Sequence, residues 1–287
     1  MSLRKTSLTC MALAIFLVTP ATGVVLASQP AATVKIYAIP PVDLGPGGGG
    51  GFRSRFTCPT ISGAGTSVCS TNWSGYAVTG ASGSVTSASG SWTVPSVTCP
   101  SRGTTYAAFW VGIDGYTSST VEQTGILADC SNGVASYLAW YEFYPAASVA
   151  ISTVSVAPGD TITASVTYSS ATGEFTTTIS SSAGGSASYS SAVSGAAQSS
   201  AEWVVERPEV CSFFCSLATL SNFGTGNLGS DYTGVAGTNA ATVSGVSGPI
   251  SSFPTAAITM VGGSSGPVLS EPTPFSTDGT SFQVTYS

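Results

Sequence analysis

The sequence predicts an all-β protein built as an antiparallel sandwich of two sheets. From Thr71 onward the chain is rich in serine, threonine, glycine, valine and tyrosine, in short alternating runs that glycines interrupt. No segment has the apolar stripe of an amphipathic helix. Many short strands with turn signals between them are typical of sandwiches and barrels. In chain order, we expect strands at 75–78, 84–94, 105–113, 121–125, 134–143, 149–155, 161–168, 174–180, 186–190, 199–207, 240–243, 256–260 and 281–286.

The first residues of the chain are expected to lie outside the folded domain. Arg4 and Lys5 precede a short apolar run at 10–18, and small residues follow up to Ala27. This pattern is typical of a secretory signal peptide, here residues 1–27. The apolar run is too short to span a membrane. We therefore expect a secreted, extracellular protein with no membrane partner.

Residues 28–55 are interpreted as a propeptide and linker. They contain Pro40-Pro41 and a glycine-rich run at 45–51, and no periodic pattern. Such a composition is typical of a flexible linker. A disordered tail without an inhibitory role is the alternative. The mature domain is then 56–287, a length that suits one all-β domain.

The cysteines indicate a disulfide framework. Cys10 lies in the predicted signal peptide, which leaves six in an exported chain. Six cysteines allow fifteen pairings. We prefer the pairs that each close a plausible turn or loop: Cys58–Cys69, Cys99–Cys130 and Cys211–Cys215. With no histidine and no Cys-x-x-Cys spacing, the sequence predicts no metal site.

Charge is divided unevenly along the chain. Five of the seven basic residues precede residue 56, and only Arg102 and Arg207 follow it. Twelve of the thirteen acids come after residue 55, so that part has a net charge of −10. Such a body argues against nucleic acid and anionic membranes as partners. A basic leader before an acidic body predicts a propeptide that covers an acidic cleft as an inhibitor.

The residue types that are missing exclude several mechanisms. A chain without histidine cannot build a Ser-His-Asp or Cys-His site. It also lacks the Asp-Thr-Gly sequence of a paired-aspartate protease. Acid–base chemistry must then come mainly from carboxyl groups, which suit acidic surroundings.

The expected strand 199–207 carries the most informative carboxylates. Glu202, Val204 and Glu206 alternate onto one face, opposite Trp203. Only 7% of the residues are charged, and a carboxylate costs desolvation energy unless it is used or paired. We therefore select Glu206 as a candidate for chemistry and look for its partner on the strand of Gln123.

Other expected strands have the same division into an apolar face and a polar, aromatic face. Trp110 and Asp114 share one face of their strand, and Trp140 and Glu142 share one face of theirs. Strands of this kind side by side make a cleft for an extended polymer. Ordinary core packing of the aromatics and structural hydrogen bonding of the carboxylates are the alternatives.

These residues leave three functions open. The first is a peptidase that acts in acid. The second is a secreted glycoside hydrolase in which Glu142 and Glu206 act as a carboxylate pair. The third is a carbohydrate-binding lectin without catalysis.

Seven motifs, in order over roughly residues 70–287, narrow this choice. They are Asn72-Trp73-Ser74-Gly75, the segment 90–95, the segment 110–115, Gln123-Thr124-Gly125, the segment 140–145, the segment 202–206 and Thr285-Tyr286. Together they resemble the glutamic peptidases, the eqolisin family. The chain differs from that pattern at Asp129, which follows Gln123 less closely, at Phe143, and in the cysteine loop after the 202–206 segment.

The resemblance implies a lectin-like, concanavalin-like jelly roll and a catalytic pair formed by Gln123 and Glu206. It places Trp110, Asp114, Trp140 and Glu142 in the substrate cleft or in support of it. It also implies a monomeric, acid-active, pepstatin-insensitive endopeptidase that cleaves polypeptides without a metal or cofactor. Glu206 would take a proton from the attacking water, and the Gln123 amide would donate to the oxyanion.

Overall fold

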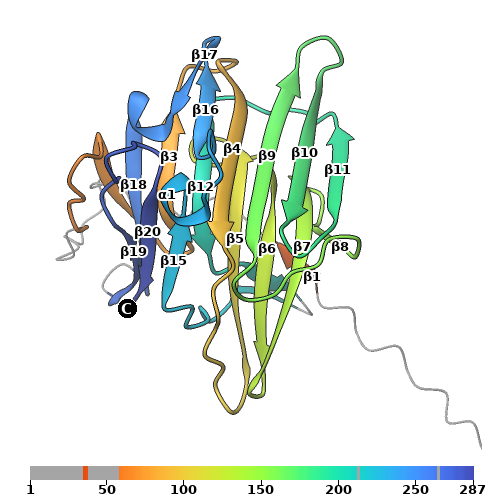
Figure 1. Ribbon diagram of the computed structural model, residues 1–287, viewed down its shortest axis with the longest axis vertical. Coiled ribbons are helices and arrows are strands. Elements are labelled where there is room, and N and C mark those ends of the chain that lie inside the picture. The colour runs from red at the N-terminus through yellow and green to blue at the C-terminus, as the bar shows by residue number, and fades with distance from the viewer. Residues whose placement is uncertain (1–34, 38–57, 212–213, 264–265) are drawn as a thin grey trace, which may run out of the picture. The chain divides into compact units, whose positions relative to one another are not determined.

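Figure 1 shows the computed structural model of the chain, which describes residues 35–37, 58–211, 214–263 and 266–287. The predicted signal peptide lies outside the described residues, as does the predicted propeptide apart from residues 35–37. The chain divides into the units 1–33 and 34–287, and everything described below belongs to the second.

Alternating sequence produces strands throughout the described part of the chain, where helix is limited to α1 (Ser230–Thr233) and η1 (Ile250–Ser252). This confirms the expected all-β, antiparallel class. Two sets of strands form. The first contains β2 (Thr66–Ser70), β3 (Trp73–Thr79), β5 (Thr104–Ile113), β6 (Val121–Ser131), β7 (Val134–Tyr144), β8 (Val149–Ile151), β12 (Ser200–Glu206) and β18 (Thr255–Val261). The second contains β4 (Val85–Thr93), β9 (Thr161–Ser169), β10 (Glu174–Ser181), β11 (Ser186–Ser191), β15 (Thr225–Leu228), β16 (Ala240–Val243), β17 (Val246–Pro249) and β20 (Phe282–Tyr286).

Strand pairing arranges these sets as two layers (Figure 1). The first layer has the order β8-β7-β6-β5-β12-β3-β18, and the second has the order β20-β15-β4-β9-β10-β11. A further strand, β19 (Val268–Pro272), pairs with both β18 and β20 and so joins the layers. The pair β2–β18 is parallel, whereas the other pairs of described strands are antiparallel.

The main core lies between the two layers. Phe109 and Trp203 of the first layer and Ile162, Val166 and Phe175 of the second are fully or almost fully buried in one apolar cluster. Burial of apolar area contributes about 25 cal/mol per Å². Both layers are therefore held by side chains that alternate inward.

Some strand bounds differ from those expected. β6 continues to Ser131, because its second half pairs on both sides with β5 and β7. β8 ends at Ile151, four residues before its expected end. The short strands β13 (Glu209–Cys211) and β14 (Cys215–Leu217) and the strand β1 (Lys35–Tyr37) were not expected. Strands of three residues carry too little alternation to be recognised.

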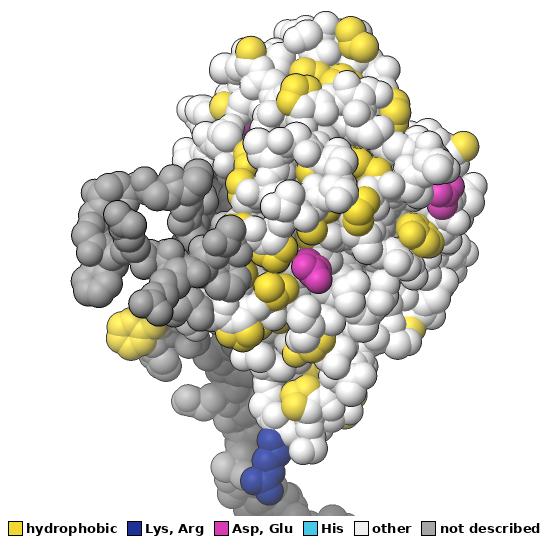
Figure 2. Space-filling view, turned by 90° about the vertical axis from the view of Figure 1, so that its left-hand side faces the viewer, with side chains coloured by type: hydrophobic (Ala, Val, Ile, Leu, Met, Phe, Trp, Pro, Cys, Tyr) yellow, Lys and Arg dark blue, Asp and Glu magenta, His cyan; other side chains and the backbone are white. Residues whose placement is uncertain are grey.

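The surface is mainly uncharged. Figure 2 views the molecule from the side on which β18 lies in Figure 1. Charged side chains are few and separated on the described part of this face, and apolar side chains form small groups. That face does not offer the large apolar patch typical of a permanent partner.

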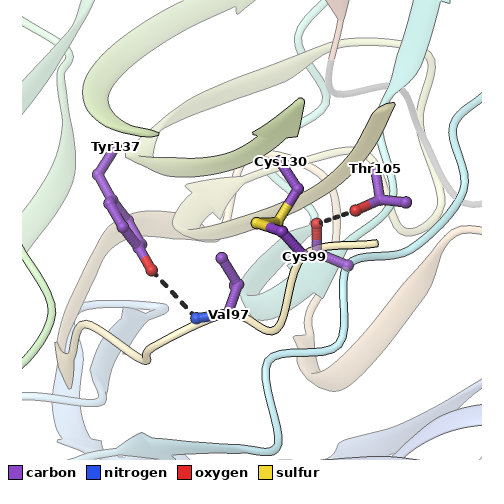
Figure 3. Close-up of a disulfide and its surroundings, with 6 residues drawn as sticks. Val97, Cys99, Thr105, Cys130 and Tyr137 are labelled. Atoms are coloured by element: carbon purple, nitrogen blue, oxygen red, sulfur yellow. Dashed lines mark hydrogen bonds between the residues drawn. A yellow bond between two sulfur atoms is a disulfide. The ribbon is translucent and has the colours of Figure 1, made fainter. Parts of the chain in front are cut away.

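The structure joins the three cysteine pairs that the sequence favoured. Their Cα–Cα distances are 5.6 Å for Cys58–Cys69, 5.3 Å for Cys99–Cys130 and 4.0 Å for Cys211–Cys215. Figure 3 shows the second pair, which ties the segment after β4 to the buried end of β6. Beside it, the Val97 N–H donates to the Tyr137 hydroxyl at 3.1 Å.

Loop length predicts which disulfide matters most for stability. Cys99–Cys130 spans 31 residues and Cys211–Cys215 spans 4. In the chain-entropy treatment these loops are worth roughly 4 and roughly 2 kcal/mol. We expect Cys99→Ala/Cys130→Ala to lower the free energy of unfolding more than Cys211→Ala/Cys215→Ala does, in denaturant titrations without reductant. An equal or reversed order would contradict this account.

Candidate active site

The candidate site lies on the face of the first layer that points away from the main core. A second apolar cluster forms there, with Trp73, Trp110, Trp140 and Val204 among its buried members. The rings of Trp73 and Trp110 meet edge to face, with centroids 4.8 Å apart. The inward and outward alternation read from the sequence therefore separates two apolar clusters, one on each face of the layer.

Strand register arranges the polar residues of this face in rows, because directly paired residues point to the same side. One row across β12, β5, β6 and β7 is Glu202, Gly112, Gln123 and Glu142; the next is Val204, Trp110, Gly125 and Trp140; the third begins with Glu206, Ala108 and Leu127. Gln123 and Glu206 thus lie on one face, on strands separated by β5. The row of Trp110 lies between their rows.

The Glu206 carboxylate is held by two donors. The Trp110 indole Nε1–H donates to Oε2 at 2.8 Å, and the Asn72 amide Nδ2 lies 3.5 Å from Oε1. The Ser70 hydroxyl donates to Asn72 Oδ1 at 2.9 Å, which turns the amide nitrogen of Asn72 toward Glu206. Hydrogen bonds from N–H groups favour the charged form of a buried carboxylate.

Gln123 is anchored by Glu142. Its Nε2 donates to Glu142 Oε2 at 2.8 Å, across the pair of β6 with β7. The neighbouring Thr124 hydroxyl donates to the Trp140 carbonyl at 2.7 Å. A side-chain amide has two N–H donors, of which this contact uses one.

Asp114 has a local role that parity did not predict. It follows the end of β5 in the left-handed region, with φ of 69°. Its carboxylate accepts from the backbone N–H groups of Gln198, at 2.7 Å, and Ser199, at 2.9 Å. It therefore fixes the turn that leads into β12, and its assignment to the cleft stays a prediction.

Two glycines leave room for this arrangement. A Cβ on Gly125 would lie 2.1 Å from the Phe109 carbonyl oxygen. A Cβ on Gly112 would lie 3.0 Å from the Trp110 ring and 3.2 Å from Gln123 Cβ. Both positions therefore set where the Trp110 ring and Gln123 can lie.

The candidate residues of the site are buried. Gln123, Glu142, Glu206 and Trp110 each have 0% of their surface exposed, and Trp140 has 5%. A substrate cannot reach Gln123 or Glu206 without a rearrangement. The sequence analysis placed Asn72 in a family motif but gave it no role; in the structure it is fully buried beside Glu206.

Two more buried carboxyl groups lie close to the site. Glu202 shares the row of Gln123, whereas Glu122 points to the opposite face of β6, beside Ile113. Both are fully buried, and the hydroxyl groups of Thr120 near Glu122 and of Ser200 near Glu202 offset that burial only in part. Burial, reinforced by the carboxylate of Asp114, raises the pKa of Glu122 to about 9. Burial also raises the pKa of Glu202 well above its usual value.

Neither the group of possible metal ligands nor the pocket described next contributes a residue to the candidate site. One group of possible metal ligands gathers in the part of the chain that the structure describes, namely Glu209, Cys211 and Cys215. The disulfide consumes both sulfur atoms of that group. A pocket of about 590 Å³ lies beside Tyr141 and Tyr189, on the face of β7 opposite Glu142. No described helix is long and apolar enough to cross a membrane.

Comparison with known proteins gives consistent matches. A family model described as the Peptidase A4 family matches residues 71–270. Aspergillopepsin-2 of Aspergillus niger is 32% identical over 180 residues, and the match covers 54% of this chain and 61% of that protein. The match thus spans about three-fifths of that relative. The eqolisin resemblance read from the motifs is confirmed.

Solved structures of glutamic peptidases also resemble this chain. The crystal structure of aspergilloglutamic peptidase from Aspergillus niger is 30% identical, with a TM-score of 0.51; the match covers 64% of this chain and 99% of that one. A crystal structure of scytalido-glutamic peptidase with a transition state analog inhibitor has a TM-score of 0.61 at 24% identity, covering 76% of this chain and 98% of that one. The second likeness shows a shared fold.

The raised pKa of Glu122 predicts a fold that loses stability as the pH rises. The carboxyl stays protonated in the folded state up to about pH 9, but ionises in the unfolded state above about 4.5. Unfolding is therefore favoured increasingly between these values, by about 3 kcal/mol at pH 7. We expect Glu122→Gln to raise the free energy of unfolding more at pH 7 than at pH 4.

The control for this experiment is Glu174→Gln, at the start of β10 in the other layer. It makes the same substitution in the other layer, away from Glu122. Any fixed cost of burying the new amide at position 122 cancels when the two pH values are compared. If Glu122→Gln gave the same change at pH 4 and pH 7, a neutral buried Glu122 would be refuted.

Proposed function

Because this chain belongs to the Peptidase A4 family, we propose that it is a secreted endopeptidase that hydrolyses peptide bonds in acid with Gln123 and Glu206. The observation that carries the proposal is the pair of donors on Glu206. Trp110 and Asn72 favour a carboxylate there, and a carboxylate is the form that accepts a proton. Burial raises the pKa of the neighbouring Glu122 and Glu202. In their protonated form these two groups could not accept the proton from water.

The reaction needs a base and an oxyanion donor. Glu206 takes a proton from a water molecule, whose oxygen attacks the scissile carbonyl. The carbonyl electrons move onto its oxygen, which accepts a hydrogen bond from the Gln123 amide. Glu206 then returns the proton to the leaving amine as the C–N bond breaks. The bond from Gln123 to Glu142 fixes the amide plane, so the donor needs little reorganisation.

Several finer statements belong to the same proposal. The layers are arranged as a lectin-like jelly roll, and the mature domain acts as a monomer after removal of residues 1–55. The full burial of Gln123 and Glu206 supports a closed precursor that must be opened before substrate enters. Acid, which protonates the cleft carboxyls, weakens their attraction for the basic leader.

The geometry disfavours a glycoside hydrolase that uses Glu142 and Glu206. Their strands are three steps apart in the first layer, about 14 Å between backbones. Each carboxylate is also bonded to a residue on an intervening strand, Gln123 or Trp110. A retaining pair requires carboxyl groups about 5–5.5 Å apart. Family membership points the same way.

The first test removes the two proposed catalytic groups. We expect Gln123→Ala to lower the kcat for a peptide substrate at acid pH by at least about a hundredfold. Glu206→Gln should cost more, because no other proton acceptor is proposed. Because both side chains are fully buried, thermal unfolding is measured for each variant, and activities are compared below the unfolding transition.

Glu142→Gln and Glu174→Gln are the comparisons. Glu142→Gln should leave partial peptidase activity, because it alters only the anchoring of Gln123, and Glu174→Gln should leave full activity. Near-normal hydrolysis by Gln123→Ala with Glu206 intact would disprove the pair. Polysaccharide cleavage that disappears in both Glu142→Gln and Glu206→Gln would instead support the glycosidase.

A second test concerns the indole donor. Trp110→Phe keeps an aromatic ring but removes the N–H that donates to Glu206. A hydrogen bond to a charged group is worth about 1.5–3 kcal/mol, or roughly ten- to a hundredfold in kcat/KM. Trp92→Phe, at a buried position in the second layer, makes the same change away from the site. A Trp110→Phe enzyme within twofold of wild type would show that the donor is unimportant.

A further inference from the structure

The strand that follows Glu206 is paired on both of its edges. β13 (Glu209–Cys211) pairs with β14 on one edge, where Cys211 is opposite Cys215. On its other edge it pairs antiparallel with β1 (Lys35–Tyr37), with Lys35 opposite Cys211, Ile36 opposite Val210 and Tyr37 opposite Glu209. These three strands form a sheet of their own.

β1 belongs to the leader that the sequence analysis assigned to residues 28–55. It is remote from β13 in the chain, and the contact is one of main-chain pairing. An edge strand without a partner exposes unpaired N–H and C=O groups and is a template for another extended segment. Adding a strand to such an edge is a known mode of peptide recognition. Residues 35–37 occupy the edge of β13 in this way.

The edge is rigid at the point of contact. The Cys211–Cys215 disulfide closes the β13–β14 hairpin at residues that are directly paired. The disulfide therefore links the two strands of the hairpin independently of the leader. A preformed edge lowers the entropy that binding must offset.

The direction of the pair relates it to the candidate site. Because the strands are antiparallel, the leader enters beside Cys211 and leaves beside Glu209. Only Arg207 and Pro208 separate Glu209 from Glu206.

We propose that the edge of β13 opposite β14 is the docking site of this chain's own leader, which binds by strand addition and so keeps the site closed. The docking itself does not depend on the proposed function, whereas the inhibition rests on it. The ligand class is an extended peptide held mainly through its backbone.

The experiment traps the pair by a disulfide in the full chain, in a Glu206→Gln background that prevents self-cleavage. Ile36→Cys is combined with Val210→Cys. Directly opposite residues of an antiparallel pair have Cα atoms about 4.5–5.5 Å apart, which a disulfide can span. Mild oxidation should join positions 36 and 210, as read by peptide mapping.

The matched control combines Ile36→Cys with Ser216→Cys. Ser216 is opposite Val210 on the other edge of β13, so position 216 is two strands from position 36, about 10 Å away. That distance is too long for a disulfide. Equal trapping at positions 210 and 216, or none at 210, would overturn the docking site.

Hydrogen exchange gives a second measurement that needs no new cysteine. Ile36→Pro removes an N–H and prevents regular pairing at that position. It should speed amide exchange in residues 209–211 at least tenfold in the full chain, whereas Ala31→Pro, before β1, should not. Unchanged exchange in Ile36→Pro would also overturn the proposal.

With Glu206 intact, the trapped chain separates inhibition from catalysis. The oxidised Ile36→Cys/Val210→Cys chain should keep its leader and leave added peptide uncut in acid, and reduction should restore cleavage. Cleavage by the oxidised chain would refute inhibition by docking. A chain that is trapped at 36 and 210 but inactive after reduction would count against the proposed function and leave the docking site standing.

Discussion

The register of β12 against β5 and β3 is the constraint on which the site depends. Its seven residues are all buried, so both faces of the strand pack against other parts of the protein. In the observed register Trp203 and Val205 enter the main core, while Glu202 and Glu206 point to the other face. A slip of one residue would exchange the faces and place carboxyl groups in the core. The apolar side of the strand thus fixes where its chemical side lies.

That register has an electrostatic cost which the composition explains. Asp114, Glu122, Glu142, Glu202 and Glu206 are all fully buried in a domain that has only two arginines after residue 55. With so few cations, ion pairing cannot neutralise this group. Some acids are held by N–H donors, as Asp114 and Glu206 are, and others by protonation, as the raised pKa of Glu122 indicates. The same composition that suits acid therefore works against the fold near neutral pH.

Much of the candidate face followed from strand parity alone. Side chains alternate between the two faces of any strand, whichever strands lie beside it. This rule alone assigned Trp110, Trp140, Glu142 and Glu206 to polar faces. The order of strands could not be read this way. That β5 separates Glu206 from Gln123 depends on pairing between distant segments, which leaves no local pattern.

The misses have physical reasons as well. Asn72 contacts a residue on a strand distant in the sequence, so the motif that contains Asn72 did not show its partner. Asp114 leaves the strand in a left-handed conformation, at which point alternation ends. Glu122 was not selected from the sequence, because its burial depends on the strands and side chains that cover both faces of β6. Each miss marks a place where a long-range contact overrides a local rule.

A leader held by charge alone would be difficult to reconcile with so few charged residues. Charge attraction between a basic leader and acidic carboxyls weakens in salt and disappears as the carboxyls are protonated. Main-chain pairing along β13 does neither, because amide and carbonyl groups do not titrate in this range. In our proposal the two kinds of contact therefore have different roles. Backbone pairing at the disulfide-closed hairpin sets where the leader lies, and side-chain charge sets the pH at which it leaves. A strand that follows directly after Glu206 is where such a division has the greatest effect, because what holds β13 also determines what lies next to the proposed catalytic carboxylate.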